Sequence, residues 1–174
     1  MINWLRQLFR PEMAPEGPVT FDFEEEIEAS AEHIYRLLDL AHEPCAKREL
    51  GHSVEEIAPG TFRFTMWQMP DTPFSITVTS AEPHRKYAYR IEPDVKVGRL
   101  QWTQERYTLA MQDNGKCLVT LLVEAQFDMP MTMREYSQEV ARMAMGCAIA
   151  LEKLRLHAEQ GAEAVLDYEA EQFA

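Results

Sequence analysis

The feature that most constrains this chain is one long amphipathic segment near its C-terminus, from Thr132 to Gln160. Thr132 can cap a helix through its hydroxyl, and Glu135 completes a capping box three residues later. Gly161 follows as a stop signal. A helix of this length needs a broad apolar surface to cover it, so we expect it to lie across a sheet. Its apolar stripe, at helical spacing, is Met133, Tyr136, Val140, Met143, Ala144, Cys147, Leu151, Leu154 and Ala158.

The preceding segment supplies that sheet. Alternating apolar and polar residues predict a strand from Val19 to Ala29, after which Ser30 caps a short helix. Pro44 separates this helix from a second helical piece, Cys45 to Leu50. Strand-like runs then follow, joined by turn signals without intervening helices. They are His52 to Ile57, Thr61 to Gln68, Phe74 to Val78, Tyr87 to Ile91, Arg99 to Met111 and Cys117 to Phe127.

This order predicts an α+β fold. Strands joined by hairpin turns pair with their neighbours, so we expect a seven-stranded curved antiparallel sheet, two short helices and a long C-terminal helix. A curved sheet against a helix leaves space between them unless large side chains fill it. The helix offers small residues there, with Gly146 beside Ala144 and Cys147. These residues either allow close packing or widen a cavity.

The net charge and the cysteines limit the kinds of partner, metal site and cell compartment to be expected. The net charge is −12, with 17 basic against 29 acidic residues. An acidic surface repels phosphate backbones and anionic lipids, so we expect neither nucleic acid nor membrane contact. Cys45, Cys117 and Cys147 are far apart and form no CxxC pair or zinc spacing. Reduced, partly buried thiols in a cytoplasmic protein are the simplest interpretation.

Composition divides the chain into three parts. Residues 1–18 form an amphipathic segment, with Leu5 and Phe9, and a proline-rich linker; 19–161 form the domain; 162–174 form an acidic C-terminal tail. The first segment is too short and polar for a signal peptide or a membrane span. Two alternatives are open for it: insertion into a membrane surface, or packing on the domain or a neighbouring copy, which the charge favours.

One acidic residue breaks the alternation of the first strand. Period two places Glu25 on the same face as Phe21, Phe23 and Ile27. We interpret Glu25 as lying at a bulge or an exposed edge. The alternative is a carboxylate that faces the interior and needs a partner there.

The run from Arg99 to Met111 carries the other polar candidates. Its more apolar face includes Tyr107 and brings Glu105 inward with it. A bulge would instead turn Arg106 inward. A carboxylate, from Glu25 or Glu105, beside either of these side chains could transfer a proton on a bound ligand. Ion pairing between strands on the exposed face is the interpretation we favour.

Three local patterns resemble the START-like, or Bet v 1-like, superfamily of polyketide cyclases and lipid-transfer domains. Ile27 to Leu38 resembles its first strand running into its first helix, Ala81 to Tyr89 the turn into its fifth strand, and Asn114 to Thr120 its final hairpin. The resemblance covers about Phe21 to Gly161. It implies a helix-grip fold with a cavity between sheet and helix. Such proteins bind lipids, steroids, quinones or polyketides, and include cyclases, hydrolases and chaperone cofactors.

The histidines offer no metal site, since none has a spacing such as HExxH. His33 and His157 fall on expected helix surfaces and His84 in a turn, so we expect these three to be solvated. His42 and His52 flank the second short helix near one end of the expected cavity, where a catalytic or ligand-binding role is the less favoured alternative. The sequence also lacks a glycine-rich phosphate loop and a nucleophile elbow. We therefore expect no metal and no cofactor.

We expect a START-like domain that binds a small apolar ligand between sheet and helix without catalysis. One alternative is a cyclase or hydrolase for an aromatic or polyketide substrate, which requires polar groups converging in the cavity. Another is a chaperone-cofactor-like interaction module, which requires a filled core and an exposed apolar patch. The predicted ligand-binding residues are Phe62, Phe64, Phe74, Ile76, Tyr89, Tyr107, Leu109, Val119, Leu121, Tyr136, Val140, Met143 and Cys147.

The back of the long helix carries a second apolar row, formed by Met145, Ile149 and Leu156. Such a row is usually covered. We expect cover from the N-terminal segment or from the C-terminal tail, within one chain or in a homodimer. The inward stripe has Tyr136 as its only polar group, which favours binding over catalysis.

Overall fold

The computed structural model describes residues 11–172. The predicted amphipathic segment around Leu5 and Phe9, and the end of the tail at Phe173, lie outside the described residues. No helix within 11–172 is long and apolar enough to cross a membrane.

The elements follow the predicted order. The strands are β1 (Val19–Ile27), β2 (Ser53–Ala58), β3 (Thr61–Thr65), β4 (Pro73–Glu82), β5 (Lys86–Pro93), β6 (Leu100–Met111) and β7 (Cys117–Phe127). The helices are α2 (Ala31–Leu38), α3 (Ala46–Glu49), α4 (Met133–Gln160) and α5 (Ala162–Gln172).

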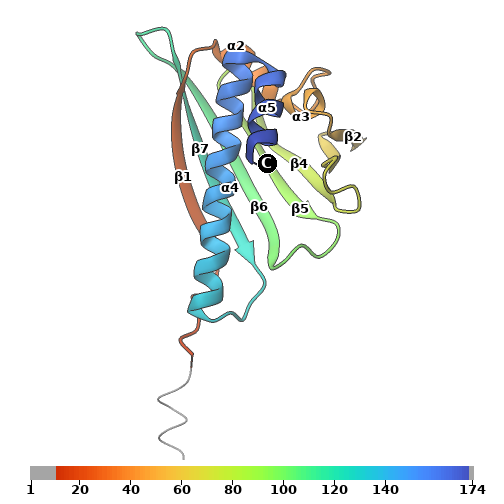
Figure 1. The fold of residues 1–174 in the computed structure, drawn as a ribbon, viewed down its shortest axis with the longest axis vertical. Helices are drawn as coiled ribbons and strands as arrows, with labels where there is room; N and C mark the ends of the chain where they lie inside the picture. The colour runs from red at the N-terminus through yellow and green to blue at the C-terminus, as the bar shows by residue number, and fades with distance from the viewer. Residues whose placement is uncertain (1–10, 173–174) are drawn as a thin grey trace, which may run out of the picture.

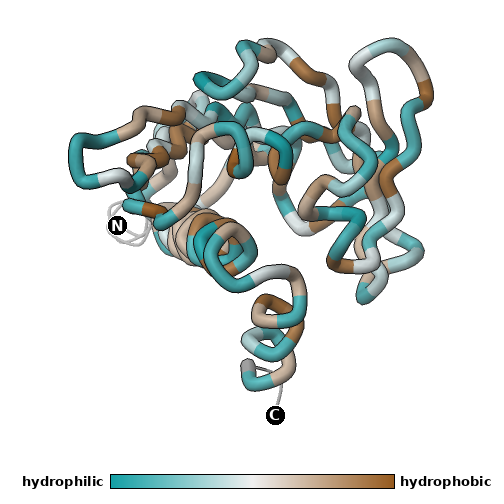
Figure 2. The backbone as a smooth tube through the Cα atoms, turned by 90° about the horizontal axis from the view of Figure 1, so that it is seen from above, coloured by the Kyte–Doolittle hydropathy of each residue, from teal (hydrophilic) through white to brown (hydrophobic). Residues whose placement is uncertain are grey.

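All the strands belong to one antiparallel sheet, in the order β1-β7-β6-β5-β4-β3-β2. Helix α4 lies across one face of this sheet along most of its height (Figure 1). Viewed from above, the strands curve around one side of α4, and α5 lies outside that curve (Figure 2). The predicted α+β architecture is confirmed.

The core lies between the sheet and α4. Along β7, alternate residues are buried, among them Val119, Leu121 and Val123. They share one apolar cluster with Leu151 and Leu154 of α4. Because a strand side chain points inward at every second residue, β7 buries one whole face against the helix.

Both ends of α4 match their sequence signals. The Glu135 N–H donates to the Thr132 hydroxyl at 3.3 Å, and the Thr132 N–H donates to the Glu135 carboxylate at 2.8 Å. This is the predicted capping box. At the other end, Gly161 has φ of 92°, and its N–H donates to the His157 carbonyl at 2.9 Å. Glycine tolerates this left-handed conformation, which lets the chain turn into α5.

The flanking segments are ordered against the domain. The residues expected to form an acidic tail form helix α5, which packs beside α4 (Figure 1) and buries Val165 completely. At the opposite end of α4, the Ala14 N–H of the linker donates to the Met131 carbonyl at 2.9 Å. Residues on both sides of the predicted domain therefore pack against it.

The structure contradicts a bulge at Glu25, but this residue does lie on the edge strand β1, with its side chain 36% exposed. The register between β1 and β7 runs without interruption, with Glu25 opposite Val119. The Glu25 carboxylate lies 3.5 Å from Nε of Arg155 on α4, and Arg155 also contacts Glu152 and Glu159. Although β1 is an edge strand, α4 packs against it, so the partly exposed Glu25 carboxylate has the Arg155 cation beside it as well as solvent.

Candidate functional site

A cavity of about 280 Å³ lies between the second half of α4 and the part of the sheet nearest α3. At about 30 Å³ per water molecule, it would hold roughly nine waters. Its volume is just below the usual range of ligand pockets, which starts near 300 Å³. Its apolar walls come mainly from α2, α3, β3 and α4. They include Leu37, Leu38, Ala46, Leu50, Phe64, Met66, Gly146, Ile149, Ala150 and Leu154.

Arg48 positions the short helix α3 at this cavity. Its guanidinium donates to the carbonyls of Leu40 at 2.7 Å, His42 at 2.9 Å and Val54 at 3.2 Å. These bonds satisfy backbone carbonyls before and after α3, which have no partner within a helix of only four residues. The neighbouring Lys47 is thereby held at the cavity wall.

Lys47 brings a cation into the apolar space. Its Nζ lies 4.6 Å from the centroid of the Phe64 ring, which is favourable because the ring face is electron-rich. Burial lowers the pKa of the Lys47 ammonium, the negative charge of Glu105 opposes that shift, and Lys153 adds to it. Lys47 forms no ion pair among the residues that the structure describes.

Glu105 forms a cluster with two tyrosines in the opposite wall. The Tyr89 hydroxyl donates to the Glu105 carboxylate at 2.8 Å and the Tyr107 hydroxyl at 3.3 Å. Burial raises the pKa of both tyrosines well above the usual value, and the charge of Glu105 raises it further. Glu105 faces inward, as the periodicity of its strand predicts, while Arg106 is exposed.

Helix α4 contributes two polar groups to the cavity, Lys153 and His157. Lys153 forms an ion pair with Glu169 of α5. His157 is 3% exposed, and its Nε2 lies 2.6 Å from the carboxylate of Glu49 on α3. The predictions that His157 is solvated and that Tyr136 is the only polar group on the inward side of α4 were wrong. Periodicity within α4 cannot show that α3 folds against its end.

His52 also lies at the cavity, packed edge-on against Phe64 with 5.5 Å between ring centroids. Burial lowers the pKa of its imidazole, and the charge of Lys47 lowers it further. His52 therefore lies near the cavity, as its place beside the second short helix predicts. By contrast, His33 and His84 are exposed, as predicted.

The structure brings together a minority of the predicted ligand-binding residues. Those that line the cavity are Phe64, Tyr89 and Tyr107. Those buried in the core elsewhere are Phe62, Phe74, Ile76, Leu109, Val119, Leu121 and Cys147. Those part-buried on the first half of α4, outside the cavity wall, are Tyr136, Val140 and Met143. Periodicity predicts which face of an element is inward, but not where along that face the packing leaves space.

The predicted back row of α4 is not one exposed patch. Met145 is 65% exposed, Ile149 lines the cavity and Leu156 is half-buried. A homodimer through this row stays a prediction.

Sequence reasoning missed the contribution of α2 and α3, and with it Lys47. A helix of four residues has no periodicity from which to identify an inward face. Lys47 also stands beside Arg48 and Glu49, so nothing in the sequence separates it from an ordinary charged surface.

The site combines apolar and polar groups. Apolar walls surround a few nitrogen and hydroxyl groups that gather at the end nearest α3. No group of three or more His, Cys, Asp or Glu side chains within 11–172 could hold a metal ion. The arrangement could enclose a small molecule with one polar end.

Solved structures share the fold of this chain. Ara h 8.0201 superposes with a TM-score of 0.60 at 15% identity, over 87% of this chain and 97% of that one. A START superfamily protein from Mycobacterium smegmatis has a TM-score of 0.57 at 13% identity, over 80% and 97%. The chain has a START-like, Bet v 1-like fold.

The START-like fold also occurs in a third similar structure, the di-domain ARO/CYC BexL from the BE-7585A biosynthetic pathway. Its TM-score is 0.55 at 19% identity, over 83% of this chain and 51% of that one. At such identities the likeness shows the fold alone. No family model matches the sequence. No curated protein matches it either.

Proposed function

We propose that this START-like domain binds a small, mainly apolar organic molecule in the cavity between α4 and the sheet, without catalysing its conversion. The observation that carries the proposal is the cavity itself. Buried Leu37, Phe64 and Leu154 and half-buried Met66 are among its walls, yet packing leaves about 280 Å³ open. Interiors are normally filled, so a space of this size is the expected feature of a ligand site.

This cavity also supports binding over the chaperone-cofactor alternative, which requires a filled core. The described cysteines are all free and buried, which is consistent with a reducing compartment. We therefore propose a cytoplasmic location together with ligand binding.

Gly146 offers a direct test, because it lies in the cavity wall and an added Cβ there would meet no heavy atom within 4 Å. Gly146→Leu should fill part of the cavity while leaving the helix intact. Ala148→Leu is the matched control, since Ala148 is exposed on the same helix and outside the cavity wall.

Native mass spectrometry and thermal shifts with a lipid, a quinone and an aromatic polyketide would measure binding. We expect wild type and Ala148→Leu to bind at least one probe or a co-purifying molecule, and Gly146→Leu to lose it. Binding by none of the proteins, or equal binding by Gly146→Leu, would contradict the proposal.

A second candidate function is that of a cyclase or hydrolase, which requires polar groups that converge in the cavity. The cluster of Glu105 with Tyr89 and Tyr107 meets that requirement, and Lys47 adds a nitrogen group nearby. A carboxylate and hydroxyls so placed could move a proton from a carbon acid. BexL, with the same fold, is a di-domain ARO/CYC protein.

Exchange of the central C–H of 1-phenylbutane-1,3-dione in D₂O, followed by NMR, tests this second function. A catalyst should accelerate exchange, and Glu105→Gln should remove the acceleration while Glu55→Gln, on the exposed edge strand β2, keeps it. Exchange at the buffer rate with wild type would exclude such proton transfer from this diketone and leave binding as the function.

A further inference from the structure

Lys47 is a cation without a carboxylate at ion-pair distance among the described residues, although the charge of Glu105 acts on it from farther away. It projects from α3 into the cavity wall, where its nearest notable partner is the face of the Phe64 ring at 4.6 Å. An ammonium group removed from water is costly unless it is paired or hydrogen-bonded. Burial accordingly lowers its pKa.

The other charged groups around the cavity already have partners. Lys153 pairs with Glu169. The carboxylate of Glu105 accepts bonds from two tyrosine hydroxyls, and Glu49 contacts His157. Each of these pairs can stay satisfied when the cavity is empty. Lys47 differs, because among residues 11–172 no carboxylate lies within ion-pair distance of its Nζ.

We propose that Lys47 binds the carboxylate of the ligand, and that the ligand is therefore an organic acid with an apolar body. This inference rests on the proposed function. The head group would lie at the α3 end of the cavity, and the apolar body would extend along Phe64, Leu154 and the wall around Gly146. A carboxylate beside the ammonium favours the charged form of lysine and forms a charge-assisted hydrogen bond.

The net charge of the chain does not favour a carboxylate ligand, so any such preference has to come from charges at the cavity. The net charge of −12 disfavours anions in general. Within the cavity, the positive charge of Lys153 favours an anion and the negative charge of Glu105 disfavours one. The charge of Glu105 is partly compensated by the hydrogen bonds that its carboxylate accepts from two tyrosine hydroxyls. Preference for an acid over the matching alcohol would therefore depend on Lys47 itself.

Decanoate and decan-1-ol are suitable probes, because they share an apolar chain and differ in the head group. Isothermal titration calorimetry at neutral pH would compare wild type with Lys47→Met, Lys47→Gln and Lys47→Arg. Lys96→Met is the matched control, since the Lys96 side chain is 78% exposed. Thermal melts of each variant would verify folding, and Lys47→Gln serves if the methionine variant does not fold.

We expect wild type to bind decanoate roughly ten- to a hundredfold more tightly than decan-1-ol. Lys47→Met and Lys47→Gln should lose this preference while keeping the affinity for decan-1-ol. Lys47→Arg and Lys96→Met should retain the preference.

The outcomes separate the two proposals. Equal wild-type affinities for acid and alcohol would overturn the role of Lys47 and leave ligand binding standing. The same would follow if Lys47→Met weakened both probes equally, since the side chain would then only shape the cavity. If wild type bound neither probe, both this inference and the proposed function would be contradicted.

Discussion

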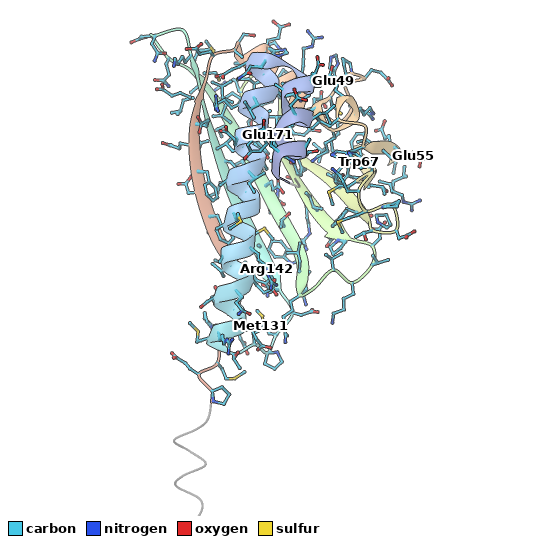
Figure 3. The ribbon with its side chains drawn as sticks, viewed as in Figure 1. Glu49, Glu55, Trp67, Met131, Arg142 and Glu171 are labelled. Carbon is cyan, nitrogen blue, oxygen red and sulfur yellow. The ribbon has the colours of Figure 1, made fainter. Side chains whose placement is uncertain are left out.

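The carboxylate of Glu49 on α3 lies 2.6 Å from Nε2 of His157, a buried residue near the end of α4. The two residues are 108 positions apart in sequence, and their contact holds α3, the shortest helix within residues 11–172, against α4, the longest there. The position of Lys47 depends on this contact, because it lies two residues before Glu49 on α3. Figure 3 shows Glu49 at this end of the molecule, and Glu55 farther out at the edge of the sheet.

Removing this contact should destabilise the domain. We expect His157→Ala to lower the free energy of unfolding by roughly 1–3 kcal/mol, because it empties a buried site and leaves Glu49 without its partner. Urea denaturation followed by circular dichroism measures the change. Glu55→Gln, on an exposed residue of β2, is the control and should change stability by less than about 0.5 kcal/mol. Equal effects of the two variants would contradict this role.

Arg155 should be the main electrostatic link between α4 and β1. It contacts Glu25, Glu152 and Glu159, so Arg155→Met would leave three carboxylates close together. We expect a loss of about 1–2 kcal/mol, larger at low ionic strength where repulsion is less screened. Arg142→Met is the matched control, since Arg142 is 72% exposed and pairs only with Glu139 among the described acids. A loss that is independent of salt would argue for packing instead.

The cavity tyrosines predict a pH dependence. Above pH 10, tyrosines in the unfolded chain lose their protons, while the raised pKa values of Tyr89 and Tyr107 keep them protonated in the folded state. The unfolded state then binds fewer protons, so stability present below pH 10 is lost as the pH rises. In the Tyr89→Phe/Tyr107→Phe double variant, unfolding free energy should fall less steeply between about pH 10 and 11. Guanidinium denaturation at each pH measures the slope; identical slopes would contradict the prediction.

The thiols should be unreactive in the folded protein. Burial raises the pKa of Cys147 to about 12, with Glu105 contributing, and burial also raises the pKa of Cys117. Cys45 is completely buried. Because the thiolate is the reactive form, the cysteines of the native protein should react slowly with 5,5′-dithiobis(2-nitrobenzoic acid) at pH 8. After unfolding, all three should react rapidly, as measured by the coloured product. Rapid stoichiometric release from native protein would show that a thiol is accessible.

Helix α5 should contribute to stability through one side of its surface. Val165 is completely buried, whereas the adjacent Leu166 is 41% exposed. We expect Val165→Ala to cost about 1–3 kcal/mol and Leu166→Ala less than about 1 kcal/mol. Thermal unfolding of both variants measures the difference. If the leucine variant were the more damaging, Leu166 would have to be covered in solution, for example by a second copy of the chain.

Much of the fold could be predicted from the sequence because its signals are local. The capping box joins residues three positions apart, and Gly161 ends α4 by its own backbone preference. Alternation along β7 fixes its buried face in the same way. Such signals determined the element order, the antiparallel sheet and the inward stripe of the long helix.

The site depended on contacts between distant segments. The partner of Glu25 is on α4, and the partner of His157 is on α3. Neither can be read from periodicity, which identifies a face but not what folds against it. The sequence by itself determined a helix lying across a curved sheet. Only the tertiary structure decided where the space remained and that Lys47 points towards it, because both follow from how α2 and α3 pack against α4.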